Sequence, residues 1–344
     1  MLHIRDLRKS YGAKEAVRGV SFSLREGERL AFLGPNGAGK TTMIRCVSGR
    51  TRPDSGTIQW QGKSIELDGA RENLGLVPQE IAVYGDLTTR ENLIAFGRFH
   101  GLRGRRLRRQ VDWALQWTGL NSRADDFVGS FSGGMKRRVN LACGVLHDPK
   151  IILLDEPTVG VDPQSRQRIF AMLDELSDGG ASILLTTHHL DEAQSQSDRI
   201  VIVDQGQVVA DGTFEQLVTQ TVGASRIVKL RVDQAVELPV PNPSEPSSSA
   251  LMGRTTTNSA EEHSNDRHPS DRHPDDQGER QPGHRPTSRR RMATLTAKID
   301  DVAGDLPRVL QSAERQGYQI HDVEVQAPTL HHVFLHLTGH ELRD

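Results

Sequence analysis

The chain of 344 residues contains few of the residues that build disulfides, aromatic clusters or membrane spans: 2 cysteines and 4% aromatic residues. Cys46 and Cys143 fall in apolar, helix-compatible contexts, which predicts two small core residues in a reducing compartment and no disulfide. No apolar run approaches the ~20 residues needed to cross a bilayer, and the N-terminus lacks the apolar core of a secretory signal. We therefore expect any path across a membrane to belong to another polypeptide.

The chain also lacks an excess of either charge. Lys and Arg total 43, Asp and Glu total 45, and the formal net charge is −2. Such a balance provides no global attraction to nucleic acid or to an anionic surface. Arginines are concentrated at residues 98–109, where a solvated helix face is a simpler explanation than a lipid or permease contact. Apart from Phe99, this run lacks interleaved aromatics of the kind that bind bases, so we expect no nucleic-acid partner.

The sequence is informative in three short motifs, of which the first is GPNGAGKTT at residues 34–42. An apolar run precedes it and a helix-compatible segment follows, which is the context of a phosphate-binding loop. The glycines let backbone N–H groups face phosphate oxygens, and the following helix adds its positive N-terminal end. Lys40 would reach the β- and γ-phosphates, and Thr41 would ligate Mg²⁺. The predicted nucleotide contacts of this loop are Gly34, Pro35, Asn36, Gly37, Ala38, Gly39, Lys40, Thr41 and Thr42.

The second motif, IILLDEP at residues 151–157, has the pattern of a buried parallel strand that ends in two carboxylates. The carboxyl ends of such strands are where α/β sheets bind ligands. Asp155 is placed to hold Mg²⁺, and Glu156 is placed to orient and polarise the attacking water. Together with the phosphate loop, this motif predicts hydrolysis of ATP with Mg²⁺ as cofactor.

The third motif, FSGGM at residues 131–135, predicts another helix start. Ser132 is a capping-type residue, and Gly133 and Gly134 allow close backbone approach. A helix N-terminus with free N–H groups attracts an anion. Because the chain already has one phosphate loop, the second anion site is explained most simply if it faces the nucleotide of a partner molecule. This predicts a homodimer.

With these motifs in this order, residues 1–217 resemble the ATP-binding subunit of an ATP-binding cassette (ABC) transporter. The resemblance implies an α/β P-loop NTPase fold, with a mostly parallel sheet, an antiparallel β subdomain and a helical subdomain. Tyr11 is similar to the aromatic residue that stacks on adenine, and His188 to the switch histidine that contacts the γ-phosphate. Gln79 resembles the glutamine that contacts metal and water and couples to the membrane subunit. Residues 159–162 match the loop that crosses between paired subunits.

The resemblance also implies the partners and a branch of the family. It implies a separate transmembrane permease and a peripheral location at the cytoplasmic face of the cell membrane. Met135 and Val159 stand where the family usually has glutamine and serine. The surrounding segments and the tail at 327–339 are similar to the daunorubicin/doxorubicin-resistance type of exporter ATPase. This favours export of a hydrophobic drug-like molecule, lipid or polysaccharide, with an importer ATPase or a soluble ABC protein of translation or DNA repair as alternatives.

The composition changes sharply near residue 239. Residues 239–291 are almost without aliphatics, which predicts a disordered insertion, because such a segment cannot bury enough apolar surface to offset its ordering entropy. Its histidines are widely spaced and lack cysteines, so they are a weak metal signal. Strand and helix patterns flank it. We therefore predict an ABC domain at 1–220 and one small C-terminal α+β domain formed by 221–238 and 292–344.

Overall fold

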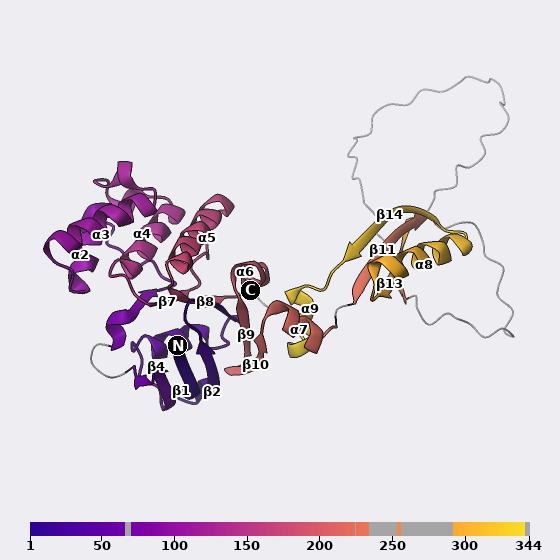
Figure 1. The fold of residues 1–344 in the computed structure, drawn as a ribbon, viewed down its shortest axis with the longest axis horizontal. Coiled ribbons are helices and arrows are strands. Elements are labelled where there is room, and N and C mark those ends of the chain that lie inside the picture. The colour runs from indigo at the N-terminus through magenta and orange to yellow at the C-terminus, as the bar shows by residue number, and fades with distance from the viewer. Residues whose placement is uncertain (66–69, 224, 234–252, 256–291, 341–344) are drawn as a thin grey trace, which may run out of the picture. The chain divides into compact units, whose positions relative to one another are not determined.

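The computed structural model describes residues 1–65, 70–223, 225–233, 253–255 and 292–340, shown in colour in Figure 1. They divide into two compact units. The first unit comprises Met1–Gly223 and Thr329–Asp344, and the second comprises Ala224–Pro328. The predicted insertion at 239–291 lies outside the described residues except for 253–255.

The first unit is built on a six-stranded sheet in the order β10-β9-β3-β8-β7-β6, parallel except for β10, which pairs antiparallel with β9. The three central strands β3, β8 and β7 are buried along their whole length, as expected for parallel strands covered on both faces. The strands are β3 (Arg29–Leu33), β6 (Leu74–Val77), β7 (Ile151–Asp155), β8 (Ser182–Thr187), β9 (Arg199–Asp204) and β10 (Gln207–Gly212).

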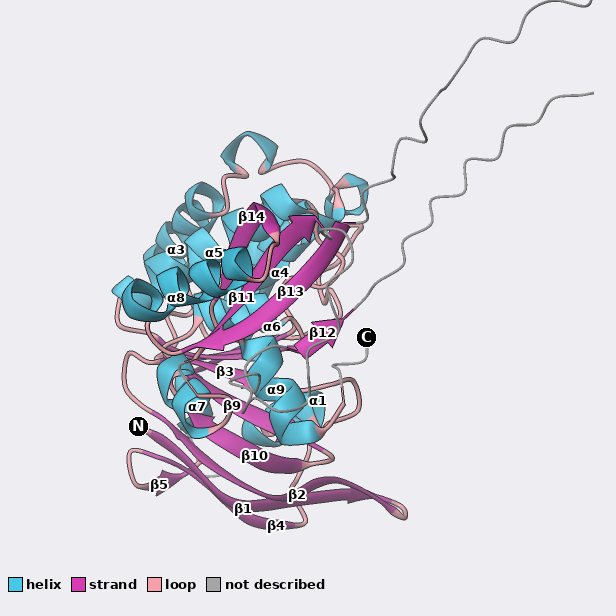
Figure 2. Cartoon of the chain, turned by 90° about the vertical axis from the view of Figure 1, so that its right-hand side faces the viewer, coloured by secondary structure: helices cyan, strands magenta, loops and turns pink. Residues whose placement is uncertain are grey.

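A second, antiparallel sheet of this unit has the order β2-β1-β4-β5 and is seen at the bottom of Figure 2. Its buried side chains alternate along the strands and share one core with α1 and the central sheet. The strands are β1 (Leu2–Tyr11), β2 (Lys14–Leu24), β4 (Ser55–Trp60) and β5 (Lys63–Ser64).

Four helices gather on the other side of the unit in Figure 1 and share an apolar core with strands β6, β7 and β8. Side chains cap three of them: Thr88, Ser132 and Asp162 each accept a hydrogen bond from a main-chain N–H of the first turn. These helices are α2 (Thr89–Phe99), α3 (Gly104–Trp117), α4 (Gly133–Val145) and α5 (Pro163–Asp178). The parallel sheet, the antiparallel sheet and this helical cluster confirm the predicted fold class.

Three other helices of the first unit are short. α1 (Lys40–Val47) follows β3, and α6 (Leu190–Gln196) and α7 (Phe214–Gln220) flank β9 and β10 in sequence. Three 3₁₀ turns lie in the described part of the unit, at Ala70–Asn73, Asn121–Arg123 and Val128–Ser130. None of the helices in the described ranges combines the length and apolarity that a membrane crossing requires.

In the residues that the structure describes, the second unit is an antiparallel sheet in the order β12-β13-β11-β14, with helix α8 packed against it. Alternate residues of β11, Val228, Leu230 and Val232, are buried with Ala313 of α8. The short strand β12 pairs with β13 and lies within the segment predicted to be the insertion. The elements are β11 (Arg226–Asp233), β12 (Gly253–Thr255), β13 (Met292–Ile299), α8 (Val302–Arg315) and β14 (Gln319–Gln326).

The last helix, α9 (Leu330–Thr338), belongs to the first unit, whereas the predicted boundaries placed all of 292–344 in the small domain. Its apolar face buries Val333 and Phe334 in a cluster with Leu217 of α7 and Ala193 of α6. The main-chain N–H of Leu330 also donates to Gln194 Oε1 at 3.0 Å. This burial explains why the tail groups with the nucleotide motifs and not with the sheet that precedes it in sequence.

Candidate active site

The phosphate-loop motif forms a tight connection between β3 and α1. Gly39, the N-cap of α1, has φ 99°, and a Cβ there would lie 2.2 Å from the carbonyl oxygen of Ala16, so only glycine fits. No side chain caps α1, and its first turn contains no acidic residue. Its first N–H groups and positive dipole end are therefore available to an anion, which fits the phosphates of a nucleotide.

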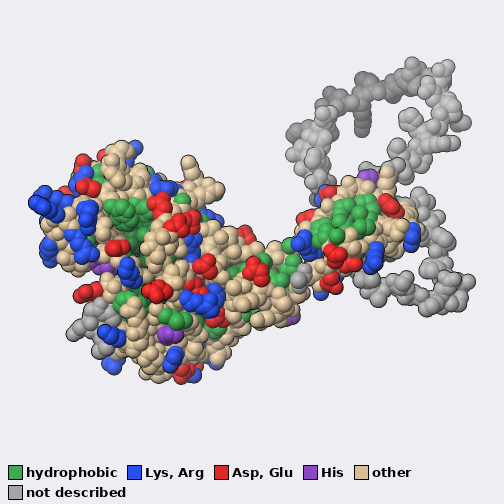
Figure 3. All heavy atoms as spheres, in the orientation of Figure 1, with side chains coloured by type: hydrophobic (Ala, Val, Ile, Leu, Met, Phe, Trp, Pro, Cys, Tyr) green, Lys and Arg blue, Asp and Glu red, His purple; other side chains and the backbone are tan. Residues whose placement is uncertain are grey.

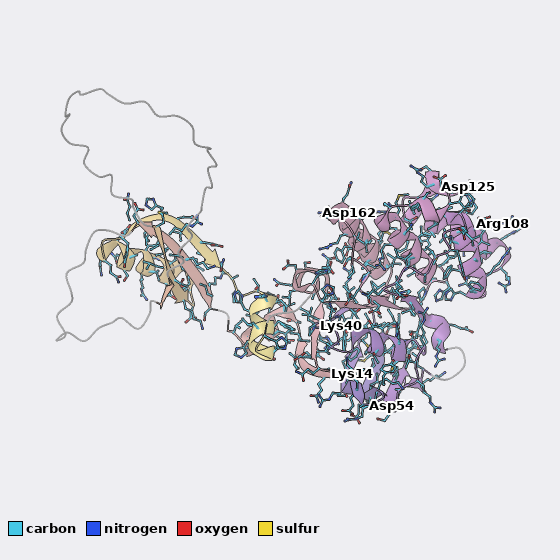
Figure 4. All side chains as sticks on the ribbon, turned by 180° about the vertical axis from the view of Figure 1, so that it is seen from behind. Lys14, Lys40, Asp54, Arg108, Asp125 and Asp162 are labelled. Atoms are coloured by element: carbon cyan, nitrogen blue, oxygen red, sulfur yellow. The ribbon has the colours of Figure 1, made fainter. Side chains whose placement is uncertain are left out.

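Lys40 is folded back over its own loop. Its side chain is 4% exposed, and Nζ donates to the carbonyl oxygens of Gly34 at 2.8 Å and Pro35 at 3.1 Å. Nζ also lies 3.0 Å from Glu156 Oε1. A buried ammonium needs an anion nearby, and here the Glu156 carboxylate provides it. Figure 4 shows Lys40 in the middle of the first unit and Arg108 at its periphery.

Asp155 ends β7 and faces Thr41 at the start of α1. Its Oδ1 accepts hydrogen bonds from Thr41 Oγ1 at 3.3 Å and from Thr186 Oγ1 at 2.8 Å. Burial raises the pKa of Asp155, against the two hydrogen bonds, which favour the ionised form. A hydroxyl and a carboxylate oxygen beside the phosphate loop are hard donors of the kind that Mg²⁺ takes together with phosphate oxygens, so this pair fits the predicted metal.

Glu156 contacts residues from three separate segments of the chain. Its Oε1 lies 3.3 Å from His188 Nδ1 as well as near Lys40, and its Oε2 accepts from Gln79 Nε2 at 3.2 Å. Burial alone would raise the pKa of Glu156, but Lys40 and then His188 outweigh burial and hold that pKa below its usual value. The structure thus brings the predicted residues Gln79, Glu156 and His188 together around Lys40.

The backbone of Glu156 is in the left-handed region, with φ 47°. A residue with a side chain adopts this conformation at a cost, and such residues are concentrated at functional sites. The main-chain N–H of Glu156 donates to Thr186, both to its carbonyl oxygen at 3.2 Å and to Oγ1 at 3.0 Å. Thr186 therefore contacts the side chain of Asp155 and the main chain of Glu156.

Two predicted nucleotide contacts lie apart from this cluster. Tyr11 ends β1 and is 48% exposed, and Lys9 Nζ lies 5.7 Å from its ring centroid. Ser132 is an exposed N-cap whose Oγ accepts from Met135 N at 3.3 Å, and Gly133 beside it is also exposed. Among the contacts of the described residues, none joins Ser132 to the phosphate loop. This agrees with a role for Ser132 toward another molecule.

The sequence reasoning missed three buried polar residues of the site. Thr186 could have been found, because it lies near the carboxyl end of β8, the strand next to β7, and is paired with Asp155. Glu192 accepts from Thr158 Oγ1 at 2.8 Å and from Thr187 Oγ1 at 3.0 Å, which joins the 158–162 loop to the loop of His188. Arg137 is 5% exposed, although its sequence context, a run of three basic residues, is typical of a solvated surface.

Comparisons with known proteins agree with these motifs. The ABC transporter family model matches residues 17–159, and an AAA-domain model matches residues 128–192. The chain is 36% identical to the linearmycin resistance ATP-binding protein LnrL of Bacillus subtilis (strain 168), over 100% of both chains. It is 35% identical to the daunorubicin resistance ATP-binding protein DrrA3 of Streptomyces coeruleorubidus, over 97% of this chain and 95% of that protein. It is also similar to a solved dimeric structure of the ATP-binding cassette MJ0796 bound to ADP and Pi. The two chains are 26% identical and superpose with a TM-score of 0.57, and the match covers 62% of this chain and 98% of that chain.

Proposed function

The chain belongs to the ATP-binding subunits of ABC transporters, and we propose that its ATP hydrolysis powers export of a hydrophobic drug-like molecule, lipid or polysaccharide through a separate membrane permease. Membership of the family makes the protein an ABC transporter ATPase that acts in ATP-driven transport. The observation that carries the export proposal is the similarity along the whole chain to two proteins named for resistance to linearmycin and daunorubicin. An ATP-driven transporter produces resistance when it lowers the amount of a compound at its target.

For the chemical step we propose that Glu156 orients and polarises the attacking water, with Gln79 and His188 as its neighbours. Thr41, Asp155 and Gln79 would hold Mg²⁺, which would neutralise phosphate charge when bound. Lys40 would hold the β- and γ-phosphates. Lys40 now pairs with Glu156 at 3.0 Å, so a bound phosphate would attract its ammonium and leave the Glu156 carboxylate available to water. Binding of ATP would in this way free Glu156 to act on the attacking water.

We further propose that two copies form a head-to-tail pair, in which the phosphate loop of one faces Ser132 of the other. Tyr11 would stack on adenine, and Gly133 would let the partner's nucleotide approach the start of α4. Gly134, also a predicted nucleotide contact, is buried, and a Cβ there would lie 2.1 Å from Ser165 Oγ, so its lack of a side chain lets α4 pack closely on α5 beneath this surface. The N-cap Ser132 and the adjacent Gly133 are exposed and available for such a contact. The solved dimeric relative bound to ADP and Pi supports this assembly.

The permease contact is proposed at the surface that follows Gln79, residues 80–91. Ile81 and Tyr84 of this segment are 38% and 52% exposed, and large exposed apolar side chains mark interaction surfaces. Gln79 itself contacts Glu156, so this segment adjoins both the site and the exposed surface. Lys and Arg side chains gather over α2 and α3 beyond it in Figure 3. The protein would then be peripheral to the cytoplasmic face of the membrane, held by its permease.

A transport experiment tests the export proposal. The chain is co-expressed with a multi-helix membrane protein encoded beside its gene, and cellular accumulation of daunorubicin is measured by its fluorescence. We expect lower accumulation with the wild type than with Lys40→Ala, and charge reversal at Glu80 or Asp86 should abolish the difference while basal ATP hydrolysis persists. Higher accumulation with the wild type would instead indicate an importer. Equal membrane association with and without every candidate permease would favour the soluble ABC class.

A further inference from the structure

Arg137, on α4, is a buried cation whose partners are main-chain carbonyl groups. Nη1 donates to the carbonyl oxygens of Gln79 at 2.6 Å and Pro78 at 3.3 Å, and Nη2 donates to that of Val159 at 3.3 Å. Within the described part of the chain, no carboxylate forms an ion pair with Arg137, and its buried Nε has no hydrogen-bond partner. The guanidinium therefore bridges two loops that are far apart in sequence.

A buried guanidinium that bonds only to main-chain carbonyl groups is an unfavourable way to stabilise a fold. Burial lowers the pKa of Arg137, yet a guanidinium keeps its proton at any physiological pH. Removing a cation from water is unfavourable, and neutral carbonyl groups offset this penalty less completely than the full charge of a carboxylate would. A residue that serves stability alone at this position could be apolar. The burial of the Arg137 charge instead indicates that the relative positions of the Gln79 and Val159 loops are important for function.

The two loops meet again at Glu156. Gln79 Nε2 donates to Glu156 Oε2 at 3.2 Å, and the main-chain N–H of Val159 donates to the Glu156 carbonyl oxygen at 3.4 Å. Arg137, Gln79, Glu156 and Val159 thus form a closed ring of contacts. Because Glu156 has a left-handed backbone, the turn from 156 to 159 needs support from outside, and Arg137 provides it.

We propose that Arg137 is a positioning residue for ATP hydrolysis: it fixes the main chain at Gln79 against the main chain at Val159, and so holds the Gln79 amide on the Glu156 carboxylate. Only a planar fork with donors on two separate nitrogens can bridge both carbonyl groups, whereas lysine offers a single ammonium. The inference rests on the proposed roles of Gln79 and Glu156. Since Arg137 lies on the helix that begins beyond Ser132, it would also tie the partner-facing end of α4 to the Gln79 loop.

Steady-state ATPase measurements on the full-length chain test this role, with Arg137→Gln and Arg137→Lys compared with Arg138→Gln. Arg138 is the matched control, because it is the next residue of α4 and also donates to a carbonyl, that of Thr118, away from the ring. We expect both Arg137 variants to lower kcat roughly 10–100-fold, the range for a reacting group displaced by about 1 Å, with little change in KM for ATP. Arg138→Gln should leave kcat near that of the wild type, and thermal melting should show that all three variants fold.

A double-mutant cycle with Gln79→Ala separates positioning from a general loss of structure. If Arg137 acts through the Gln79 side chain, Arg137→Gln should lower kcat by less than about threefold in the Gln79→Ala background. Additive losses, a normal kcat in both Arg137 variants, or an equal loss in Arg138→Gln would each overturn the inference. If Gln79→Ala and Glu156→Gln themselves hydrolyse ATP normally, the proposed site fails first. If they are impaired and the Arg137 variants are not, only the role of Arg137 fails.

Discussion

Lys40 and Glu156 form an ion pair that is almost completely withdrawn from water, with Nζ 3.0 Å from Oε1 and exposures of 4% and 5%. Each of these groups is predicted to act on a different part of the reaction, the lysine on phosphate and the carboxylate on water. While the two groups are paired, the lysine is not available to phosphate and the carboxylate is not available to water. In the proposed mechanism, the pair would couple the arrival of the phosphates to the release of the Glu156 carboxylate, which predicts different defects for substitutions of the two residues.

Glu156→Gln should retain ATP binding and lose turnover. The amide keeps the size of the side chain but cannot accept a proton, and general base catalysis contributes roughly 10²–10⁴-fold. Lys40→Ala should weaken nucleotide binding itself, because it removes the only side-chain charge of the phosphate loop. Titration with a fluorescent ATP analogue and phosphate-release assays distinguish the two defects. Near-normal hydrolysis by Glu156→Gln would reject its assignment as the base.

ATP should join two copies of the chain when hydrolysis is blocked. In the proposed pair each nucleotide lies between Lys40 of one copy and Ser132 of the other, so bound ATP contributes to the interface. Sedimentation of Glu156→Gln at saturating ATP and Mg²⁺ should show a dimer, and Ser132→Arg in the same background should restore the monomer. A monomer in both samples would make pairing with a different cassette the better interpretation.

His147 should make the protein less stable in mild acid. Its Nε2 lies 3.0 Å from the Leu74 carbonyl oxygen, and its ring stacks on His100 at 3.8 Å between centroids. Burial, then the charge of His100, lowers the pKa of His147 from 6.5 to about 4. Because the unfolded chain takes up the proton first, the stability that depends on neutral His147 is complete above pH 6.5 and is lost as the pH falls toward 4.

Urea unfolding between pH 7.5 and 4 measures this effect. The full loss attributable to His147 is on the order of 3 kcal/mol, from the difference between the two pKa values. In His147→Gln the dependence of the unfolding free energy on pH should be shallower than in the wild type by that amount. His336→Gln, at an exposed position of α9, is the matched control. Parallel curves for His147→Gln and the wild type would contradict the prediction.

Removal of the Phe334 side chain should destabilise the unit that carries the nucleotide motifs. Phe334 is 1% exposed, and Phe→Ala changes in a core cost about 3–5 kcal/mol. Leu335→Ala is the control, because that neighbouring side chain of α9 is 40% exposed. Chemical denaturation followed by ATP binding should show the loss at Phe334 alone. Equal effects of the two substitutions would mean that α9 does not pack as described.

Each motif of this chain consists of residues that are contiguous in sequence, so the structure around each motif could be predicted. An apolar strand followed by glycines or by two carboxylates can be identified from the sequence itself. Because ligands bind at the carboxyl ends of such strands, the α/β fold and the meeting of Lys40, Asp155 and Glu156 at one sheet edge could be anticipated. Gln79 and His188 follow from the family pattern. Their assembly on a single carboxylate depends on contacts between distant loops, for which spacing along the chain provides no signal.

The residues that sequence reasoning missed show the limit in physical terms. Arg137 lies in a basic run that is typical of a solvated face, and only the packing of α4 against the two loops buries it. The same applies to α9, because helical periodicity reveals an apolar face but not which surface covers it. The strand β12 is three residues long and lies in a segment of disorder-type composition. Its pairing with β13 could not be anticipated either.

The position of α9 also has a consequence for the order of synthesis. The cluster around Leu33, Leu217 and Phe334 is completed by the last helix, while all of Ala224–Pro328 is translated before it. At ribosomal rates of about 5–20 residues per second, the apolar surface that α9 covers stays open on the nascent chain for roughly 5–20 s after α7 has emerged. A premature stop codon in the final stretch of the gene would leave every nucleotide-binding motif intact and still yield a protein with an exposed, aggregation-prone core.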